Sequence, residues 1–151
     1  MNNIKLKQLK ELTKIDENTQ FYNISILANI SSFLFETGSN LNWVGFYFLE
    51  KDNLYLGPFQ GQVACTKISV STGVCGKCIR ESKTIYVSNV HEFSGHIACD
   101  NRSNSELVIP IYNKKELYGV LDIDSYKLDN FTSDDIEYYE NVANIISNSL
   151  K

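Results

Sequence analysis

The fold is decided by the stretch Asn42-Trp43-Val44-Gly45-Phe46-Tyr47-Phe48-Leu49-Glu50. Read as a strand, it puts Trp43 and Tyr47 on one face and three purely apolar side chains on the other, because consecutive side chains alternate. Both faces are apolar, which predicts a central strand that is covered on both sides. An indole N–H or a phenol O–H usually needs a hydrogen-bond partner when buried. The Trp43 face is therefore either ordinary core or a functional surface.

Working outward from this strand, the chain alternates helical and extended segments. A helical spacing of apolar residues predicts helices at 4–12 and 19–36 and a C-terminal helix that starts in 131–135. The stretch 73–80 resembles a loop that opens a short helix, which residues 81–83 end. Extended segments are predicted at 54–56, 63–68, 84–87, 106–112 and 116–124, and the stretch 57–62, which begins with Gly57-Pro58, is predicted to break the first of them. This order predicts an α+β fold with a central, mostly antiparallel sheet flanked by helices.

Length and composition exclude several classes of protein. At 151 residues, with 43% hydrophobic and 21% charged residues, we expect one globular domain over 1–151, including a short N-terminal helical segment. A net charge of −4 argues against nucleic-acid binding, and the apolar runs are far shorter than the roughly 20 residues of a membrane span. The first residues lack the pattern of a secretory signal, so we expect a cytoplasmic protein. In that reducing compartment, four cysteines favour redox, catalytic or metal roles.

The segment 116–124 carries an anomaly, two carboxylates on one face of a strand. Asp122 and Asp124 are two residues apart, so their side chains share a face at a spacing of roughly 7 Å. Glu106, on the neighbouring strand, would reach the same region if the hairpin registers that way. Clustered carboxylates are costly unless a cation, a shared proton or water compensates them. The two hypotheses are a site for an ammonium group or Mg²⁺ and a solvated sheet edge.

The cysteines divide into two kinds of setting. Cys75 and Cys78 have CxxC spacing in the short helix at 73–80, where the helix dipole would favour a Cys75 thiolate. A zinc site would need two further ligands, because the chain has no second CxxC. Cys65 and Cys99 lie beside glycine and alanine in polar loops, which favours accessible thiols. Three cysteines near one carboxylate-rich region point to redox chemistry on a small ligand.

Seven short motifs follow one another along the chain: Asn42–Tyr47, Leu56–Gly61, Val63–Cys65, Gly73–Gly76, Gly95–Asp100, Ser105-Glu106 and Leu121–Ser125. Taken in this order, they resemble the free methionine-(R)-sulfoxide reductases, which are stand-alone GAF-domain enzymes. The similarity spans about residues 20 to 148, and three cysteines match the separations of that family. Cys78 departs from the family pattern, either as an alternative disulfide partner or as a buried thiol. The resemblance implies a GAF domain that reduces free L-methionine-(R)-sulfoxide to methionine.

The resemblance also implies a role for each cysteine. Cys99 would attack the sulfoxide sulfur and become a sulfenic acid, and Cys65 would condense with it to an intramolecular disulfide. Cys75 would be auxiliary or an alternative resolving cysteine, and the choice between Cys99 and Cys75 as the nucleophile stays open. A thioredoxin-like reductant would reopen the disulfide, and no cofactor or metal ion is expected.

The remaining implied roles concern the substrate. Glu106, Asp122 and Asp124 would hold its ammonium group, and one of them, kept protonated by its neighbours, would donate a proton to the leaving oxygen. Trp43 and Tyr47 would wall the pocket around the methyl-sulfinyl group. The N-terminal helix would pack on the domain or on a second copy in a homodimer. The alternative function is a GAF sensor module that binds a small molecule without turning it over.

Overall fold

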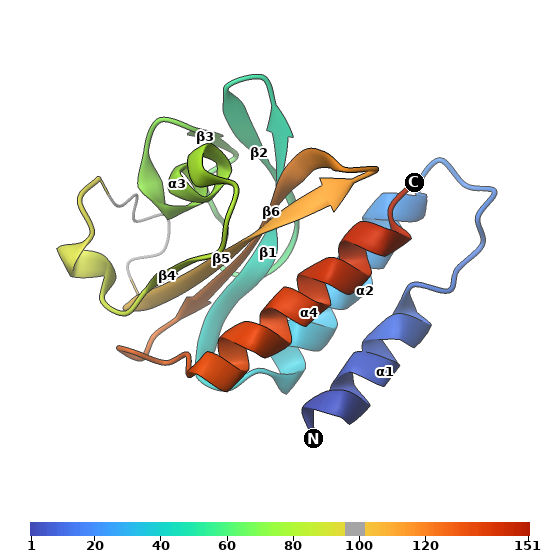
Figure 1. Cartoon of the computed structure of the whole chain (residues 1–151), viewed down its shortest axis with the longest axis horizontal. Coiled ribbons are helices and arrows are strands. Elements are labelled where there is room, and N and C mark those ends of the chain that lie inside the picture. Colours follow the sequence, from blue (N-terminus) through green and yellow to red (C-terminus); the bar gives the residue numbers. More distant parts are fainter. Residues whose placement is uncertain (96–101) are drawn as a thin grey trace.

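The structure is a computed structural model that describes residues 1–95 and 102–151 (Figure 1). Its helices are α1 (Asn2–Leu12), α2 (Tyr22–Thr37), α3 (Gly73–Glu81), the 3₁₀ turn η1 (Val90–Glu92) and α4 (Ser133–Ser149). Its strands are β1 (Leu41–Glu50), β2 (Asn53–Gly61), β3 (Lys67–Ser69), β4 (Ile85–Val87), β5 (Ser105–Asn113) and β6 (Glu116–Ser125). Within these described residues, none of the helices is long and apolar enough to cross a membrane.

The strands form one antiparallel sheet in the order β3-β2-β1-β6-β5-β4. β1 pairs with β2 on one side and with β6 on the other, so the strand at 42–50 is central, as its two apolar faces predicted. β5 and β6 form the predicted hairpin through Lys114 and Lys115, which both have a positive φ. The α+β fold with a mostly antiparallel sheet is therefore confirmed.

Helices cover both faces of the sheet, and one face carries more of them than the other. α2 and α4 lie side by side on one face, and α1 packs against these two helices on their outer side (Figure 1). The larger core lies between the sheet and this helical layer, and it takes Val44, Phe46 and Leu121 from the two central strands. α3 covers the opposite face, where a second core contains Trp43 and Tyr47. The alternation of β1 thus divides its side chains between the two cores.

The predicted break at Gly57-Pro58 is wrong, because β2 continues through both residues to Gly61. The ladder between β1 and β2 absorbs them in an irregularity: Gly45 pairs with Phe59, whereas Tyr47 pairs with Leu56. Proline lacks an N–H for a ladder but is tolerated at such a bulge. The extended segment predicted at 63–68 is also shorter, since only Lys67–Ser69 pairs with β2. Residues 62–66 connect the two strands without regular structure.

α4 begins where its sequence signals predicted. Thr132 caps the helix by accepting a hydrogen bond from the Asp135 backbone N–H, and the Asp135 carboxylate accepts one from the Thr132 backbone N–H. This reciprocal pair is a capping box, which satisfies two of the N–H groups left unpaired at a helix start. α4 then packs on β5 and holds the helical face of the hairpin in place.

Candidate active site

The hairpin of β5 and β6 brings the three predicted carboxylates into one region. Glu106 lies directly opposite Asp124 in the ladder, and Val108 lies opposite Asp122. Glu106 and Asp122 are therefore diagonal neighbours on the sheet face that α3 covers, a separation within reach of such side chains. The expectation that Glu106 reaches the two aspartates is confirmed. Asp122 is only 6% exposed, which contradicts the solvated-edge hypothesis for this residue, and Asp124 is half-buried.

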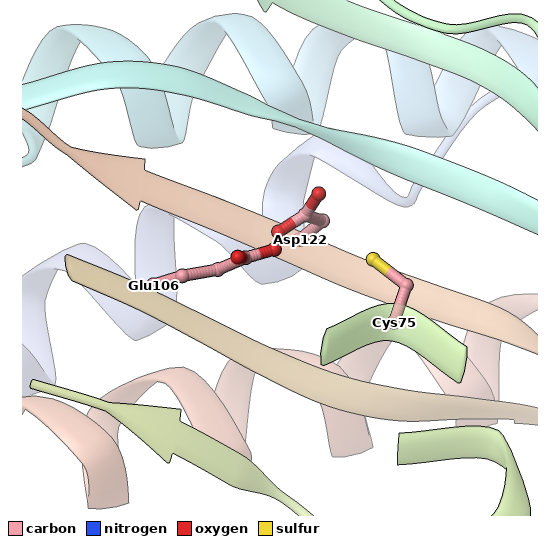
Figure 2. Close-up of side chains that lie close together, drawn as sticks. All are labelled: Cys75, Glu106 and Asp122. Carbon is pink, nitrogen blue, oxygen red and sulfur yellow. The ribbon is translucent and has the colours of Figure 1, made fainter. Parts of the chain in front are cut away.

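α3 adds a thiol to the carboxylates. Cys75 is the third residue of this helix, and its side chain points toward the carboxyl groups of Asp122 and Glu106 (Figure 2). The Cys75 Sγ atom and one carboxylate oxygen of each acid all lie within 4.8 Å of one another. All three side chains are buried, and Asp122 Oδ1 accepts no hydrogen bond. This thiol–carboxylate cluster therefore has an unused acceptor in a site shielded from water.

Burial dominates the electrostatics of the two acids. It raises the pKa of Glu106 to about 8, and the negative charge of Asp124 opposes ionisation further. The pKa of Asp122 is raised well above its usual range by burial and by the charge of Glu106. A hydrogen bond joins the two carboxyl groups, so the two acids share a proton. The pair titrates as a unit and holds at least one proton at neutral pH.

The prediction that the helix dipole stabilises a Cys75 thiolate is wrong. Burial and the charges of Asp122 and Glu106 raise its pKa well above the usual thiol range, and a hydrogen bond with Asp122 acts in the same direction. The dipole of a nine-residue helix does not offset full desolvation next to two acids. Cys75 is therefore a protonated thiol that can donate to Asp122.

Cys78, one turn further along α3, is fully buried, and burial raises its pKa to about 12. Among the described residues, 1–95 and 102–151, one group of three or more potential metal ligands is found, and it consists of Cys75, Glu106 and Asp122. Cys78 does not belong to it, so the described residues offer no support for a zinc site built on the CxxC pair. The CxxC spacing reflects two thiols on one buried helix face.

Aromatic rings form a platform beside the cluster. Trp43 stacks on Phe59 at a centroid distance of 5.3 Å and on Tyr47 at 5.8 Å. Gly45 makes the stack possible, because a Cβ at this position would lie 2.4 Å from the Phe59 Cβ and 2.6 Å from the Trp43 ring. Phe59 was not predicted as part of this surface, because the supposed break at Gly57-Pro58 removed it from the strand.

Both polar groups of the platform have partners, as burial requires. The Trp43 indole N–H donates to the Gln62 carbonyl at 3.1 Å, and the Tyr47 hydroxyl donates to the Cys65 carbonyl at 2.9 Å. Cys65 is half-buried and disulfide-bonded, whereas Cys75 and Cys78 are free thiols. Cys99, the predicted nucleophile, lies outside the described residues. Four predicted site residues thus lie together: Tyr47, Cys75, Glu106 and Asp122. Trp43 and Cys65 lie beside them on the same side of the sheet.

Comparisons with known proteins place this geometry in a family. A sequence model of the GAF domain matches residues 25–151, so the fold is that of a GAF domain protein. Among curated proteins, the free methionine-R-sulfoxide reductase of Escherichia coli is 49% identical over 112 residues, which are 74% of this chain and 68% of that protein.

Solved structures agree with this comparison. The reduced form of fRMsr from Staphylococcus aureus is 43% identical, with a TM-score of 0.91 over 99% of this chain and 95% of that one. The free methionine-R-sulfoxide reductase of Neisseria meningitidis, in complex with its substrate, is 34% identical, with a TM-score of 0.90 over 98% of this chain and 87% of that one. The chain belongs to the free methionine-R-sulfoxide reductase family.

Proposed function

We propose that this protein reduces free L-methionine-(R)-sulfoxide to methionine with thiols as the source of electrons. The observation that carries the proposal is the buried cluster of Cys75, Glu106 and Asp122, with its shared proton and an unused acceptor at Asp122 Oδ1. Buried like charges are costly without a compensating cation. The relatives that carry this activity in their names share the fold over most of this chain.

The substrate ammonium is the cation that fits this cluster. An ammonium group has three N–H donors, and the three carboxyl groups of Glu106, Asp122 and Asp124 offer more than enough oxygens to accept them. Binding would let a carboxyl group of the Glu106–Asp122 pair ionise, because a positive charge within hydrogen-bond distance lowers a carboxyl pKa. Selectivity for the free amino acid follows, since a peptide-bound residue has no charged α-amino group.

The same pair of acids supplies a proton for the reaction. Sulfoxide oxygen leaves the methionine sulfur more readily when it is protonated, and a carboxyl group held neutral by burial is a suitable donor. Glu106, with a pKa of about 8, and Asp122, with a pKa well above its usual range, both satisfy this requirement at neutral pH. Trp43 and Tyr47 would wall the methyl-sulfinyl group with their stacked rings.

The cysteine steps transfer one oxygen and then release it as water. We place the nucleophile at Cys99: its sulfur attacks the sulfoxide sulfur, takes the oxygen to become a sulfenic acid, and methionine leaves. The Cys65 thiolate then attacks the sulfenic sulfur, an S–S bond forms and the hydroxyl leaves as water. The disulfide at Cys65 and the free thiols of Cys75 and Cys78 support this pairing. A dithiol reductant of the thioredoxin type would reopen the disulfide.

A direct assay tests the proposal. The reduced protein is incubated with each epimer of free methionine sulfoxide and with dithiothreitol, and methionine is measured over time. We expect several turnovers with the R epimer and none with the S epimer. Substrate binding that raises the melting temperature without methionine release would instead establish a GAF sensor module and overturn the proposal.

A further inference from the structure

The segment that carries Cys65 is anchored from β1 by two buried side chains. Trp43 and Tyr47 project from the same face of this strand, each 2% exposed, and donate to the carbonyl groups of Gln62 and Cys65. The two acceptors are three residues apart in the chain that runs from the end of β2 to the disulfide-bonded cysteine. We call these two hydrogen bonds the Cys65 tether.

The segment depends on the tether because it has no regular secondary structure of its own. Residues 62–66 lie outside the strands, and Val63 is 87% exposed, whereas Ala64 and Cys65 pack against the second core. A backbone hydrogen bond from the Leu56 N–H to the Thr66 carbonyl, at 3.1 Å, fixes the chain on the far side of the cysteine. Without the tether, a turn of this kind would sample many conformations. Forming the Cys65 disulfide would then cost the free energy of restricting the turn to one of them.

The local sequence is adapted to the tether at Gly61. This residue has a φ of +129°, a backbone conformation that side chains rarely adopt. A Cβ there would lie 2.6 Å from the Trp43 Cδ1 atom, so glycine lets the chain turn directly over the indole ring. The turn places the next carbonyl, that of Gln62, on the indole N–H. The Trp43 ring and the turn at Gly61 are therefore in direct contact.

The Tyr47 hydroxyl is a constant donor in this arrangement. Burial raises the Tyr47 pKa far above neutrality, and negative charge on Asp122 acts in the same direction. The hydroxyl proton thus stays in place and remains committed to the Cys65 carbonyl at 2.9 Å. The phenol proton is therefore present at every physiological pH, and the hydrogen bond to Cys65 does not depend on pH in that range.

We propose that Trp43 and Tyr47 are positioning residues for the resolving cysteine: their hydrogen bonds hold the Cys65 backbone where its thiol meets its disulfide partner. This inference rests on the proposed function, in which Cys65 resolves the sulfenic acid. The step concerned is the attack of the Cys65 thiolate on the sulfenic sulfur, with an S–S bond formed and water released. Its rate depends on how often the reduced segment presents Cys65 in the bonding position.

The test compares Tyr47→Phe, which removes one oxygen from the tether, with Tyr55→Phe, which removes an oxygen from an exposed ring on β2. Each reduced protein is equilibrated in dithiothreitol buffers of graded redox poise, and the fraction of Cys65 in disulfide form is measured by alkylation and mass spectrometry. We expect Tyr47→Phe to lower the equilibrium constant for disulfide formation by about 2- to 10-fold, the contribution of one neutral hydrogen bond. Tyr55→Phe should match the wild type.

A second readout follows the step itself. After one equivalent of methionine sulfoxide, dimedone should trap more sulfenic acid in Tyr47→Phe than in Tyr55→Phe, relative to the methionine released. Trp43→Phe removes the other donor and provides the same comparison if Tyr47→Phe does not fold. Equal disulfide constants for the tether variants and Tyr55→Phe would overturn the inference. The redox titration uses no sulfoxide, so a wild type without turnover would refute the proposed function and leave the tether intact.

Discussion

Replacing Glu106 with glutamine removes a buried titrating group while keeping its size and polarity. The Glu106 carboxyl has a pKa of about 8 in the folded protein, against an ordinary value of 4.5, because burial and the charge of Asp124 disfavour its ionised form. Between these values the folded state holds a proton that the unfolded chain has lost, so stability falls as pH rises. The stabilisation is fully present below about pH 4.5 and is lost as pH passes through about 8. Each pH unit in this window changes the free energy of unfolding by about 1.4 kcal/mol for one proton.

We therefore expect Glu106→Gln to have a flatter stability profile than the wild type. From pH 5 to pH 7 the free energy of unfolding of the wild type should fall by about 3 kcal/mol more than that of the variant. The raised pKa of Asp122 adds a slope in the same direction, which both proteins keep in part. Urea unfolding of the reduced proteins at pH 5, 6 and 7 measures the difference, provided that the denaturant slope m stays constant.

The control variant is Glu116→Gln, which changes an exposed carboxyl group at the start of β6. Its profile should run parallel to that of the wild type, because neutralising an exposed group leaves the buried pair unchanged. Parallel profiles for wild type and Glu106→Gln would refute the reasoning. In that case the Glu106 carboxyl would have the same proton affinity in the folded and unfolded states.

Further predictions concern the reaction, the substrate and the turn at Gly61. Cys99→Ser should abolish methionine release, whereas Cys65→Ser should release about one methionine per chain and then stall; a burst in Cys99→Ser that is lost in Cys75→Ser would make Cys75 the nucleophile. N-acetylated methionine sulfoxide should react about 10- to 100-fold more slowly than the free amino acid, since it lacks the charge that the carboxylates bind; comparable rates would refute an ammonium site. Asp122→Asn should stay folded but lose most of the rise in melting temperature that methionine sulfoxide gives the wild type by mass action. Gly61→Ala should lower the free energy of unfolding by about 1 to 3 kcal/mol, because it forces a side chain into a disfavoured φ against Trp43; an unchanged urea midpoint would show that the turn relaxes freely.

The sequence alone was sufficient to predict the features that depend on interactions between neighbouring residues. The alternation of β1 assigned Trp43 and Tyr47 to one face, and the structure places them in the core beneath α3. The spacing of Asp122 and Asp124 put both carboxyl groups on one strand face, and the hairpin register then brought Glu106 opposite Asp124. Strand periodicity and helix capping depend on a few neighbouring residues, so these features can be predicted from short stretches.

Two predictions failed because distant residues outweighed local signals. Gly57-Pro58 is a strong breaker pair, but the partner strand β1 absorbs it in an irregularity between Gly45 and Tyr47, so β2 continues. The N-terminal position of Cys75 in α3 favours a thiolate, but the fold buries the thiol against Asp122 and Glu106 and raises its pKa. Ladder register and desolvation are set by the partners across the sheet, which a local window does not contain.

The sequence by itself determined which residue types are available to the site and which face of each strand they occupy. The three-dimensional structure decided how close they lie and in which protonation state. Within 4.8 Å of one another, Cys75, Glu106 and Asp122 cease to be independent groups and share protons as a cluster. The reason is physical: pattern and propensity act over a few residues of chain, whereas burial and Coulomb interactions depend on distances in space, which only packing brings about.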